Sequence, residues 1–590
     1  MVAASGAVSL HSDAHLQADL LDAATDLQLE TASADIGRLD AGADAVVNSA
    51  GALAVALGRV GGDAQLHSAG AMRIGELQAQ GALNAAAGAA LVAQTLSSGS
   101  AMQLDASDAL EVQQLRSAGD LAAAAGGLLG IGDLVADGDA RLEGAADVRL
   151  AQGVVGQSLD VAAAGTLDVR AATVGGDAQL RSGGAMDIGT LQAQGALSGT
   201  TGATLVAQTL SSGAAMQLDA AGALQIQRLT SNGDFIANAG GLLAIDNAAV
   251  GGQAGIDGGT DVQLGNATVA QSLVLNAGGA ITVGSAAVDG SMTLRAGQSI
   301  EVGTAAIGVD GDWVAGTHLS ADEVTVGCNF RGDAGAWLAI GTLNAGCGIG
   351  LSAHDALRFD ALQAAGGIAL ASRGSDVQGR QLDAGTLQVQ AAGDIRIEAA
   401  RAGGDLVATS GGTQQWGAYQ AGGNATLQAG RDIQFSSGRS GGAHSIIAGG
   451  SIGFERASAG TTAYMDAQAG SVAGGQLQAA AAQLSARDTL SLAQAMVDTR
   501  LNLAADDVQA QVRQSDAGEG VLTTTLTGYR NGVARRIVVD VQPRDAWLID
   551  ALQAMEAQLT SSSSRVAIAD GHVERSMTLT TPSLQLLMDN

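Results

Sequence analysis

The chain has 590 residues, of which 47% are hydrophobic but only 2% are aromatic, and it contains 86 glycines and 2 prolines. Its formal net charge is −30 at pH 7 and it has no lysine, so it lacks the basic surface that binding to nucleic acid or to an anionic membrane requires. No run of 18 apolar residues is present, which excludes a transmembrane helix. We expect no nucleic-acid partner and no membrane insertion.

The amino-terminal segment, MVAASGAVSLHSDAHLQADLL, lacks a basic stretch followed by an apolar one, so we expect the chain to have no signal peptide of its own. A repeat pattern already runs through residues 5–42, slightly out of phase with the pattern that follows. We therefore expect the chain to start within a repeat array and to be a fragment of a longer protein.

A 19-residue period runs through residues 43–498, and we expect it to be uninterrupted. Apolar residues recur at repeat positions 3, 5, 11 and 13, as in Leu159, Val161, Leu167 and Val169. Residues two apart in a strand face the same side, so each pair predicts a short strand with one buried face. A third apolar site near positions 16 to 18 predicts a third strand. The pattern predicts an all-β fold, a parallel β-helix solenoid of 19-residue coils that forms a shaft over residues 1–498.

Residues 61–130 and 175–244 are duplicates that share long identical stretches, among them LVAQTLSSG and AMQLDA. The offset between the two copies equals six coils. A stack of coils tolerates such a duplication because the added coils present the same two end faces as before.

The period fades after residue 498, and residues 499–590 predict a small α+β module. Residues 521–541 have the pattern of a β-hairpin around Asn531 and Gly532. Residues 543–559 have helical spacing, and two strand-like segments follow them. Such a module covers the open end of the last coil or forms an independent domain.

The coils, for example QSLDVAAAGTLDVRAATVG at residues 157–175, resemble the repeat region of filamentous haemagglutinin-like exoproteins. These belong to the two-partner secretion systems of Gram-negative bacteria, and the resemblance covers at least residues 61–498. It implies a right-handed parallel β-helix that an outer-membrane transporter exports and that serves as an adhesin at the cell surface. The family's amino-terminal secretion domain is missing from this chain, which agrees with our expectation of a fragment.

Arg331, Gly332 and Asp333 form the tripeptide that integrin-type receptors recognise, and adhesins of this family can carry one. The tripeptide occupies repeat positions 4 to 6, where Phe330 should point inward and Arg331 outward along a strand. Recognition motifs generally lie on protruding loops, and chance explains such a tripeptide in a chain of this composition. We retain it as a candidate receptor motif.

Some parallel β-helices cleave polysaccharides, which requires carboxylates and basic residues clustered on one outer face. Asp120 and Asp139 are one period apart and could form an acid pair, but solvated turn residues explain them more simply. We see no cluster of acidic and basic residues on one face, and no metal-binding, phosphate-binding or nucleophile motif. We expect no enzyme activity, no catalytic residues, no cofactor and no metal.

The two cysteines, Cys328 and Cys347, are also one period apart and both occupy repeat position 1. Stacked strands place such residues about 4.8 Å apart, within the Cα separation that a disulfide accepts. The sequence allows a disulfide between them or two reduced thiols, and an oxidising compartment favours the disulfide.

These observations favour a non-catalytic shaft of a secreted bacterial surface adhesin. Its expected partners are the outer-membrane transporter and a receptor on a host or bacterial cell. A first alternative is the stalk of a contact-dependent toxin, which requires a catalytic domain downstream. A second alternative is a carbohydrate-active β-helix.

Overall fold

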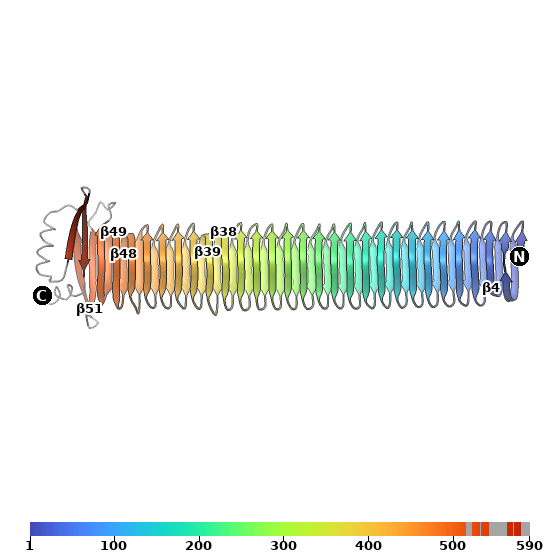
Figure 1. Cartoon of the computed structure of the whole chain (residues 1–590), viewed down its shortest axis with the longest axis horizontal. Coiled ribbons are helices and arrows are strands. Elements are labelled where there is room, and N and C mark those ends of the chain that lie inside the picture. The colour runs from blue at the N-terminus through green and yellow to red at the C-terminus, as the bar shows by residue number, and fades with distance from the viewer. Residues whose placement is uncertain (515–521, 531–532, 542–562, 570–571, 580–590) are drawn as a thin grey trace. The chain divides into compact units, whose positions relative to one another are not determined.

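The computed structural model describes residues 1–514, 522–530, 533–541, 563–569 and 572–579. These residues form strands and contain no helix, so none of them lies in a helix that could cross a membrane. The chain divides into two compact units, Met1–Gly297 and Gln298–Asn590. In each unit the strands of successive coils lie side by side in parallel (Figure 1), which confirms the expected all-β parallel β-helix of 19-residue coils.

The first unit begins with less regular strands and continues with alternating strands of five and eight residues. The first four strands are β1 (Val2–Ala4), β2 (Val8–Ala18), β3 (Leu21–Ala23) and β4 (Leu27–Ala41). The five-residue strands are β5 (Ala45–Ser49), β7 (Ala64–Ser68), β9 (Leu83–Ala87), β11 (Met102–Ala106), β13 (Leu121–Ala125), β15 (Ala140–Gly144), β17 (Leu159–Ala163), β19 (Ala178–Ser182), β21 (Leu197–Thr201), β23 (Met216–Ala220), β25 (Phe235–Ala239), β27 (Ala254–Gly258), β29 (Leu273–Ala277) and β31 (Met292–Ala296). The eight-residue strands are β6 (Leu53–Val60), β8 (Met72–Ala79), β10 (Leu91–Ser98), β12 (Leu110–Ser117), β14 (Leu129–Ala136), β16 (Val148–Val155), β18 (Leu167–Val174), β20 (Met186–Ala193), β22 (Leu205–Ser212), β24 (Leu224–Ser231), β26 (Leu243–Val250), β28 (Val262–Val269) and β30 (Ile281–Val288).

The second unit repeats this alternation, with four longer strands in which successive segments of a coil are continuous. The short strands are β33 (Gly311–Ala315), β35 (Phe330–Ala334), β37 (Ile349–Ala353), β41 (Leu406–Ser410), β43 (Ala425–Ala429), β45 (His444–Ala448) and β47 (Thr462–Ala467). The eight-residue strands are β32 (Ile300–Ile307), β34 (Leu319–Val326), β36 (Leu338–Ala345), β40 (Ile395–Ala402), β42 (Gln414–Ala421), β44 (Ile433–Ser440) and β46 (Ile452–Ala459). The longer strands are β38 (Leu357–Ser372), β39 (Val377–Ala391), β48 (Val472–Ala486) and β49 (Thr489–Ala505).

Each regular coil contains two strands, not the three that the sequence predicts. In β8, Met72 at the start and Ala79 at the end point inward, but Gly75 and Glu76 in the middle both point outward. Because side chains alternate in a straight strand, two outward residues in succession require the strand to bend. The expected second and third strands are therefore one continuous strand with a bend at repeat position 14.

Inward side chains of successive coils stack in columns and form a narrow core. Leu142, Val161 and Leu180 occupy the same repeat position on three consecutive coils and are fully buried. Each large aliphatic side chain buried in this way contributes about 1.5 to 3 kcal/mol. The predicted inward positions 3, 5, 11 and 13 are therefore confirmed as the core of each coil.

The register of the coils departs from the regular period at a few places. Leu21 pairs with Leu39, one position short of a full period, which explains why the pattern of residues 5–42 is out of phase. In the second unit, Val377 lies one position beyond a full period from its partner Leu357 and one position short of a full period from its partner Ile395. The start of β48 is displaced in the same way. The expectation of an uninterrupted period is wrong at these two coils. At each of them a separation one residue longer than the period is followed by one that is one residue shorter, so the period is restored.

The solenoid pairing continues past the expected boundary at residue 498, because β49 pairs in parallel with β48 as far as Ala504. Beyond it lie β50 (Asp507–Gln514), β51 (Leu522–Arg530), β52 (Val533–Val541), β53 (Ser563–Ala569) and β54 (His572–Leu579). Strands β51 and β52 pair antiparallel with Arg530 opposite Val533, which confirms the expected hairpin. The helix expected over residues 543–559 lies outside the described residues.

Inward aromatic side chains of the second unit are accommodated by glycine on the neighbouring coil. A Cβ atom built on Gly379 would lie 1.9 Å from Cζ of Phe359, and one built on Gly474 would lie 2.2 Å from Cζ of Phe454. Both distances are far below van der Waals contact, so the ring of one coil occupies the space that a side chain on the next coil would need. These glycines are required for packing.

We predict that Gly474→Ala lowers the free energy of unfolding by about 1 to 3 kcal/mol, because overpacking forces neighbouring side chains to shift. Gly453→Ala is the matched control, since a Cβ there would meet only the Gln434 side chain, at 3.8 Å. In the double variant Phe454→Leu/Gly474→Ala, the smaller side chain at position 454 should restore part of the lost free energy of unfolding. Hydrogen exchange of the β46 and β48 amides measures the effect, and equal losses in the two alanine variants would contradict it.

A buried polar cluster lies in the core of the coils that contain β42, β44 and β45. The Tyr419 hydroxyl and Nε2 of His444 are 2.5 Å apart, and both side chains are buried. The buried Gln414 side chain accepts a hydrogen bond from Trp416 Nε1 and donates one to the carbonyl oxygen of Gln428. Burial lowers the pKa of His444 to about 4, because the charged imidazolium is poorly solvated there.

We predict that these coils lose stability as the pH falls from about 6.5 to about 4. In that range an unfolded His444 binds a proton and the folded, buried one does not, so acid favours the unfolded state. At pH 5 the loss amounts to about 2 kcal/mol, or about a 30-fold drop in hydrogen-exchange protection of the β43 and β45 amides. The variant Tyr419→Phe/His444→Leu should lack this loss of stability in acid. Identical pH profiles for the variant and the unaltered chain would refute the prediction.

Candidate binding surfaces

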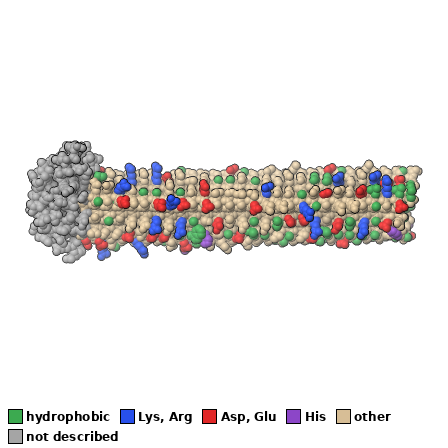
Figure 2. Space-filling model, in the orientation of Figure 1, with side chains coloured by type: hydrophobic (Ala, Val, Ile, Leu, Met, Phe, Trp, Pro, Cys, Tyr) green, Lys and Arg blue, Asp and Glu red, His purple; other side chains and the backbone are tan. Residues whose placement is uncertain are grey.

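The outer surface of the solenoid carries most of the charge. Figure 2 shows arginine and acidic side chains interspersed along the visible face, with wide areas of other residues between them. Acidic residues outnumber arginines, so the overall field is negative, and local groups of residues modify it from place to place.

The candidate receptor motif lies within strand β35. Phe330 and Gly332 point inward, whereas Arg331 points outward, as the sequence predicts. Asp333 also points outward, is half-buried, and accepts a hydrogen bond of 2.8 Å from the Ser352 hydroxyl. The motif is therefore extended backbone, paired with β33 on one side and β37 on the other, and does not form a protruding loop.

The glycine of this motif has a packing role of its own. Gly332 is the register partner of Trp313, whose side chain is fully buried. A Cβ atom on Gly332 would lie 3.1 Å from Leu351 and 3.3 Å from the Phe330 ring. The ring of Trp313 packs edge to face against Phe330 at a centroid distance of 4.9 Å, so glycine at position 332 leaves room for this aromatic pair.

Aspartates at the corners of the coils form hydrogen bonds to the next coil. Oδ1 of Asp44 accepts a hydrogen bond of 2.9 Å from the backbone N–H of Asp63, whose own Oδ1 accepts one of 2.8 Å from the N–H of Ala82. At a second corner Asp147 accepts a hydrogen bond from the N–H of Thr166, which lowers the pKa of the Asp147 carboxyl group below its usual value. Many of the acidic residues are therefore structural, because they satisfy backbone donors at the corners.

Asp120 and Asp139 belong to the same set of corner residues. Oδ1 of Asp120 accepts a hydrogen bond of 2.9 Å from the N–H of Asp139, and Oδ1 of Asp139 accepts one of 2.8 Å from the N–H of Ser158. The structure does bring the two carboxylates together on consecutive coils. Each carboxylate, however, accepts a hydrogen bond from a backbone N–H of the next coil, as the other corner aspartates do.

The two aspartates line a shallow groove of about 520 Å³ in the first unit. The other charged side chains of this groove also have partners: Arg141 forms an ion pair with Glu143, and Arg181 donates a hydrogen bond of 3.3 Å to Asp160. A ligand in this groove would compete with existing interactions. Among the described residues, no group of three or more histidine, cysteine or acidic side chains could hold a metal ion.

Comparisons with protein-family models, with curated proteins and with solved structures find no match to this chain. The resemblance to filamentous haemagglutinin-like exoproteins therefore depends on the pattern of the coils.

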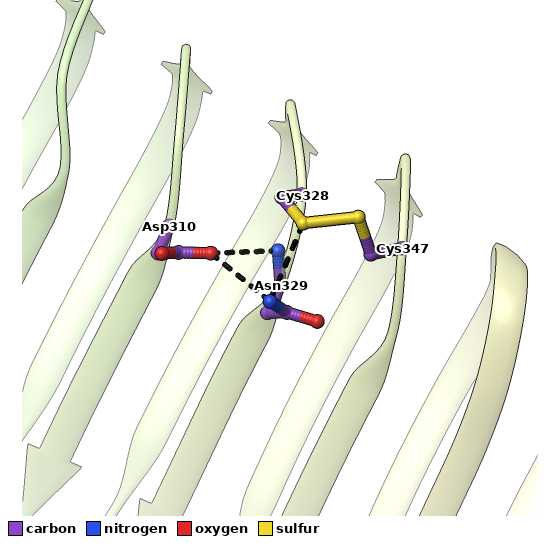
Figure 3. Close-up of a disulfide and its surroundings, with 4 residues drawn as sticks. All are labelled: Asp310, Cys328, Asn329 and Cys347. Carbon is purple, nitrogen blue, oxygen red and sulfur yellow. Dashed lines mark hydrogen bonds between the residues drawn. A yellow bond between two sulfur atoms is a disulfide. The ribbon is translucent and has the colours of Figure 1, made fainter.

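A disulfide joins Cys328 and Cys347 at one corner of the second unit (Figure 3). Their Cα atoms are 4.5 Å apart, as expected for the same position on consecutive coils. Next to the disulfide, Oδ1 of Asp310 accepts a hydrogen bond of 2.9 Å from the backbone N–H of Asn329. The corner is thus held by a covalent link and by the same kind of aspartate contact that other corners use.

One group of charged residues is not apparent from the sequence, and the expectation that no face combines acidic and basic residues is wrong. On the outer face of β38, β39 and β40, Arg358, Asp360, Arg380 and Glu398 line a second groove, of about 470 Å³. The available signal was charged residues at repeat positions 12 and 14 of successive coils. The one-residue displacement of β39 hides it, because Arg380 falls at position 15 in a strict 19-residue frame.

Proposed function

We propose that this chain is the shaft of a secreted bacterial surface adhesin of the filamentous haemagglutinin type. The observation that carries the proposal is that both units are stacks of repeated 19-residue coils, with aliphatic residues inward and variable residues outward. Such a stack can be extended in whole coils while it presents side chains along its length. An outer-membrane transporter exports the chain, and a receptor on a host or bacterial cell is its partner.

The proposal assigns no catalytic residue. Asp120 and Asp139 accept backbone hydrogen bonds at the corners, which supports a structural role for them. Receptor binding through Arg331, Gly332 and Asp333 is not part of the proposal, because the motif is paired strand and its glycine faces the core, close to Phe330 and Leu351. A contact-dependent toxin stalk shares the fold, and extension of the reading frame to a downstream catalytic domain would identify it.

The test measures surface exposure and adhesion separately. In the native host, protease added to intact cells should digest the protein, and deletion of the neighbouring outer-membrane transporter gene should protect it. Beads coated with the purified full chain should adhere to cells, whereas beads coated with albumin should not. Arg331→Gln should adhere like the unaltered chain. Protection from protease on intact wild-type cells, or the absence of adhesion, would contradict the proposal.

A further inference from the structure

One corner of the second unit carries a stacked pair of rings at its surface. The His318 imidazole and the Trp337 indole lie on consecutive coils, with ring centroids 4.9 Å apart and an angle of 11° between the ring planes. This distance is close to the spacing of parallel strands, so the two rings stack in the direction in which the coils stack. Trp337 is 41% exposed, whereas the other described tryptophans, Trp313 and Trp416, are buried. The indole is therefore part of the outer surface and not of the core.

The indole face opposite His318 has no ring partner. The N–H of Leu319 donates a hydrogen bond of 3.1 Å to the carbonyl oxygen of Trp337, and the N–H of Leu338 donates one of 2.9 Å to that of Ala356. Ala356 therefore occupies the same corner position on the following coil, and its methyl group is too short to cover an indole. Among the described residues, no second ring and no guanidinium group stacks on Trp337. A flat group of a partner could extend the stack on this side.

Two carboxylates belong to the same corner, on the side of the open indole face. Asp355 directly precedes Ala356, is exposed, and has no side-chain hydrogen bond or ion pair with any residue that the structure describes. Its Oδ1 lies 3.6 Å from the place of a Cβ atom on Gly374, which belongs to the following coil. On that coil Asp376 takes the corner position, and its Oδ1 accepts a hydrogen bond of 2.7 Å from the N–H of Asp394. The corner thus retains carboxylate oxygens that can accept further hydrogen bonds.

The coils that lead to this corner are strongly acidic. Residues 298–357 contain seven acidic residues and one arginine, Arg331. Arg373, on the following coil of the same corner, donates a hydrogen bond of 3.5 Å to the Ser352 hydroxyl group. An indole face attracts cations, and an acidic surface raises their local concentration. The charge and the open ring face therefore both favour a cationic ligand.

A guanidinium group fits this corner better than other cations do. It is planar and weakly hydrated, so it can stack on an indole while its edge donates hydrogen bonds to carboxylates. The ammonium group of lysine is compact and strongly hydrated, so it gains less from an aromatic face. A quaternary ammonium group has no N–H to donate to Asp355. Arginine is the protein side chain that satisfies both the ring face and the carboxylates.

We propose that this corner binds an arginine side chain of a partner protein. The guanidinium plane stacks on the open face of Trp337, lies over Ala356, and donates hydrogen bonds to Asp355 and Asp376. The acidic surface around it favours further basic residues on either side of that arginine. The inference gives the receptor of the proposed adhesin an exposed basic segment that contains arginine, and in that respect it rests on the proposed function.

The test is titration calorimetry on the purified full chain with three pentapeptides, at an ionic strength of about 0.15 M. The first peptide has arginine at its centre and lysine elsewhere, the second is pentalysine, and the third has citrulline in place of the arginine. The first two carry the same charge, so general attraction to an acidic surface does not distinguish them. We expect the arginine peptide to bind about fivefold more tightly than pentalysine, and the citrulline peptide to bind least tightly.

Two substitutions should abolish the preference for arginine over lysine. Trp337→Leu removes the aromatic face, whereas Trp337→Phe should retain part of the preference. Ala356→Leu covers the open side of the indole. This change is compatible with the fold, because Leu242 occupies the equivalent corner position in the first unit, where its carbonyl oxygen accepts a hydrogen bond of 2.9 Å from the N–H of Leu224.

Glu301→Gln is the control, because Glu301 is exposed on β32 and contributes to the same acidic stretch without belonging to the corner. It should weaken the arginine peptide and pentalysine alike and leave the ratio of their affinities unchanged. Equal binding of these two peptides to the unaltered chain would overturn the inference. A preference for arginine that survives both Trp337→Leu and Ala356→Leu would overturn it as well. The adhesion of coated beads is measured independently, so the proposed function and this site can fail separately.

Discussion

Deletion of residues 61–174 should leave a folded solenoid with nearly unchanged thermal stability, although it removes six whole coils. The new junction joins Val60 to Gly175, so that β5 and β6 stack on β19 and β20 instead of on β7 and β8. The inward residues of β19 and β20 are identical to those of β7 and β8. The register is therefore preserved, and the loss of six coils from a one-dimensional stack leaves every remaining contact intact.

The matched control is a deletion of only ten residues, 91–100, which removes β10 and the corner that follows. The deletion removes Leu91 and Leu96, which stack between inward residues of β8 and β12. Each buried leucine contributes about 1.5 to 3 kcal/mol, and the strands on either side lose their hydrogen-bonding partner as well. Limited proteolysis and circular dichroism should show local unfolding with this small deletion only. Equal damage from the two deletions would refute the register on which the prediction depends.

Loss of the disulfide should destabilise the surrounding coils of the second unit by about 3 kcal/mol, as the chain-entropy model gives for the short loop that it closes. The variant Cys328→Ser/Cys347→Ser should therefore show about a 100-fold drop in hydrogen-exchange protection of the β35 and β37 amides. Exchange is the appropriate measurement because a long repeat array does not unfold as one cooperative unit.

Reductant provides the control for this prediction. It should lower the protection of the unaltered chain to the level of the double-serine variant, and it should have no effect on that variant. Peptide mapping without reductant should find Cys328 linked to Cys347. An equal response of the two proteins to reductant, or two free thiols in the protein recovered from the cell exterior, would contradict the disulfide.

The fold could be predicted because the inward positions of each coil are filled by residues of recognisable pattern. Pairs such as Leu159 and Val161 show the two-residue spacing of a strand, and their recurrence with a constant period requires stacking. The inward position 7 could not be found in this way, because small or polar residues fill it. Ser68 is buried there and donates hydrogen bonds to the carbonyl oxygens of Gly51 and Gly70.

The number of strands per coil depends on a bend that the pattern of apolar residues does not reveal. A gap of two outward residues, such as Gly75 and Glu76, can mark either a corner between strands or a bend within one strand. Only the backbone pairing on both sides of the gap distinguishes the two cases. In the structure this pairing resumes at once after the gap, which makes a single strand.

The candidate sites differ in how far the sequence could predict them. The cysteine pair follows directly from the period, because equal repeat positions become neighbours in space. The charged groove does not, because Arg380 aligns with Asp360 and Glu398 only after the extra residue in β39 is placed.

The central feature of the fold is that each 19-residue repeat forms one coil and that successive coils stack at the spacing of parallel strands. Pulsed electron paramagnetic resonance on spin labels at exposed positions of the first unit tests it directly. One labelled pair is Gln103→Cys with Gln179→Cys, four coils apart, and the other is Gln103→Cys with Gln217→Cys, six coils apart. Both pairs are placed in the Cys328→Ser/Cys347→Ser chain.

The two distances should be about 19 Å and about 29 Å, so the second pair should be about 10 Å farther apart than the first. This difference does not depend on the length of the label because the label is the same in both pairs. An increase of about 20 Å would indicate repeats stacked at the spacing of packed helices and would contradict the β-solenoid.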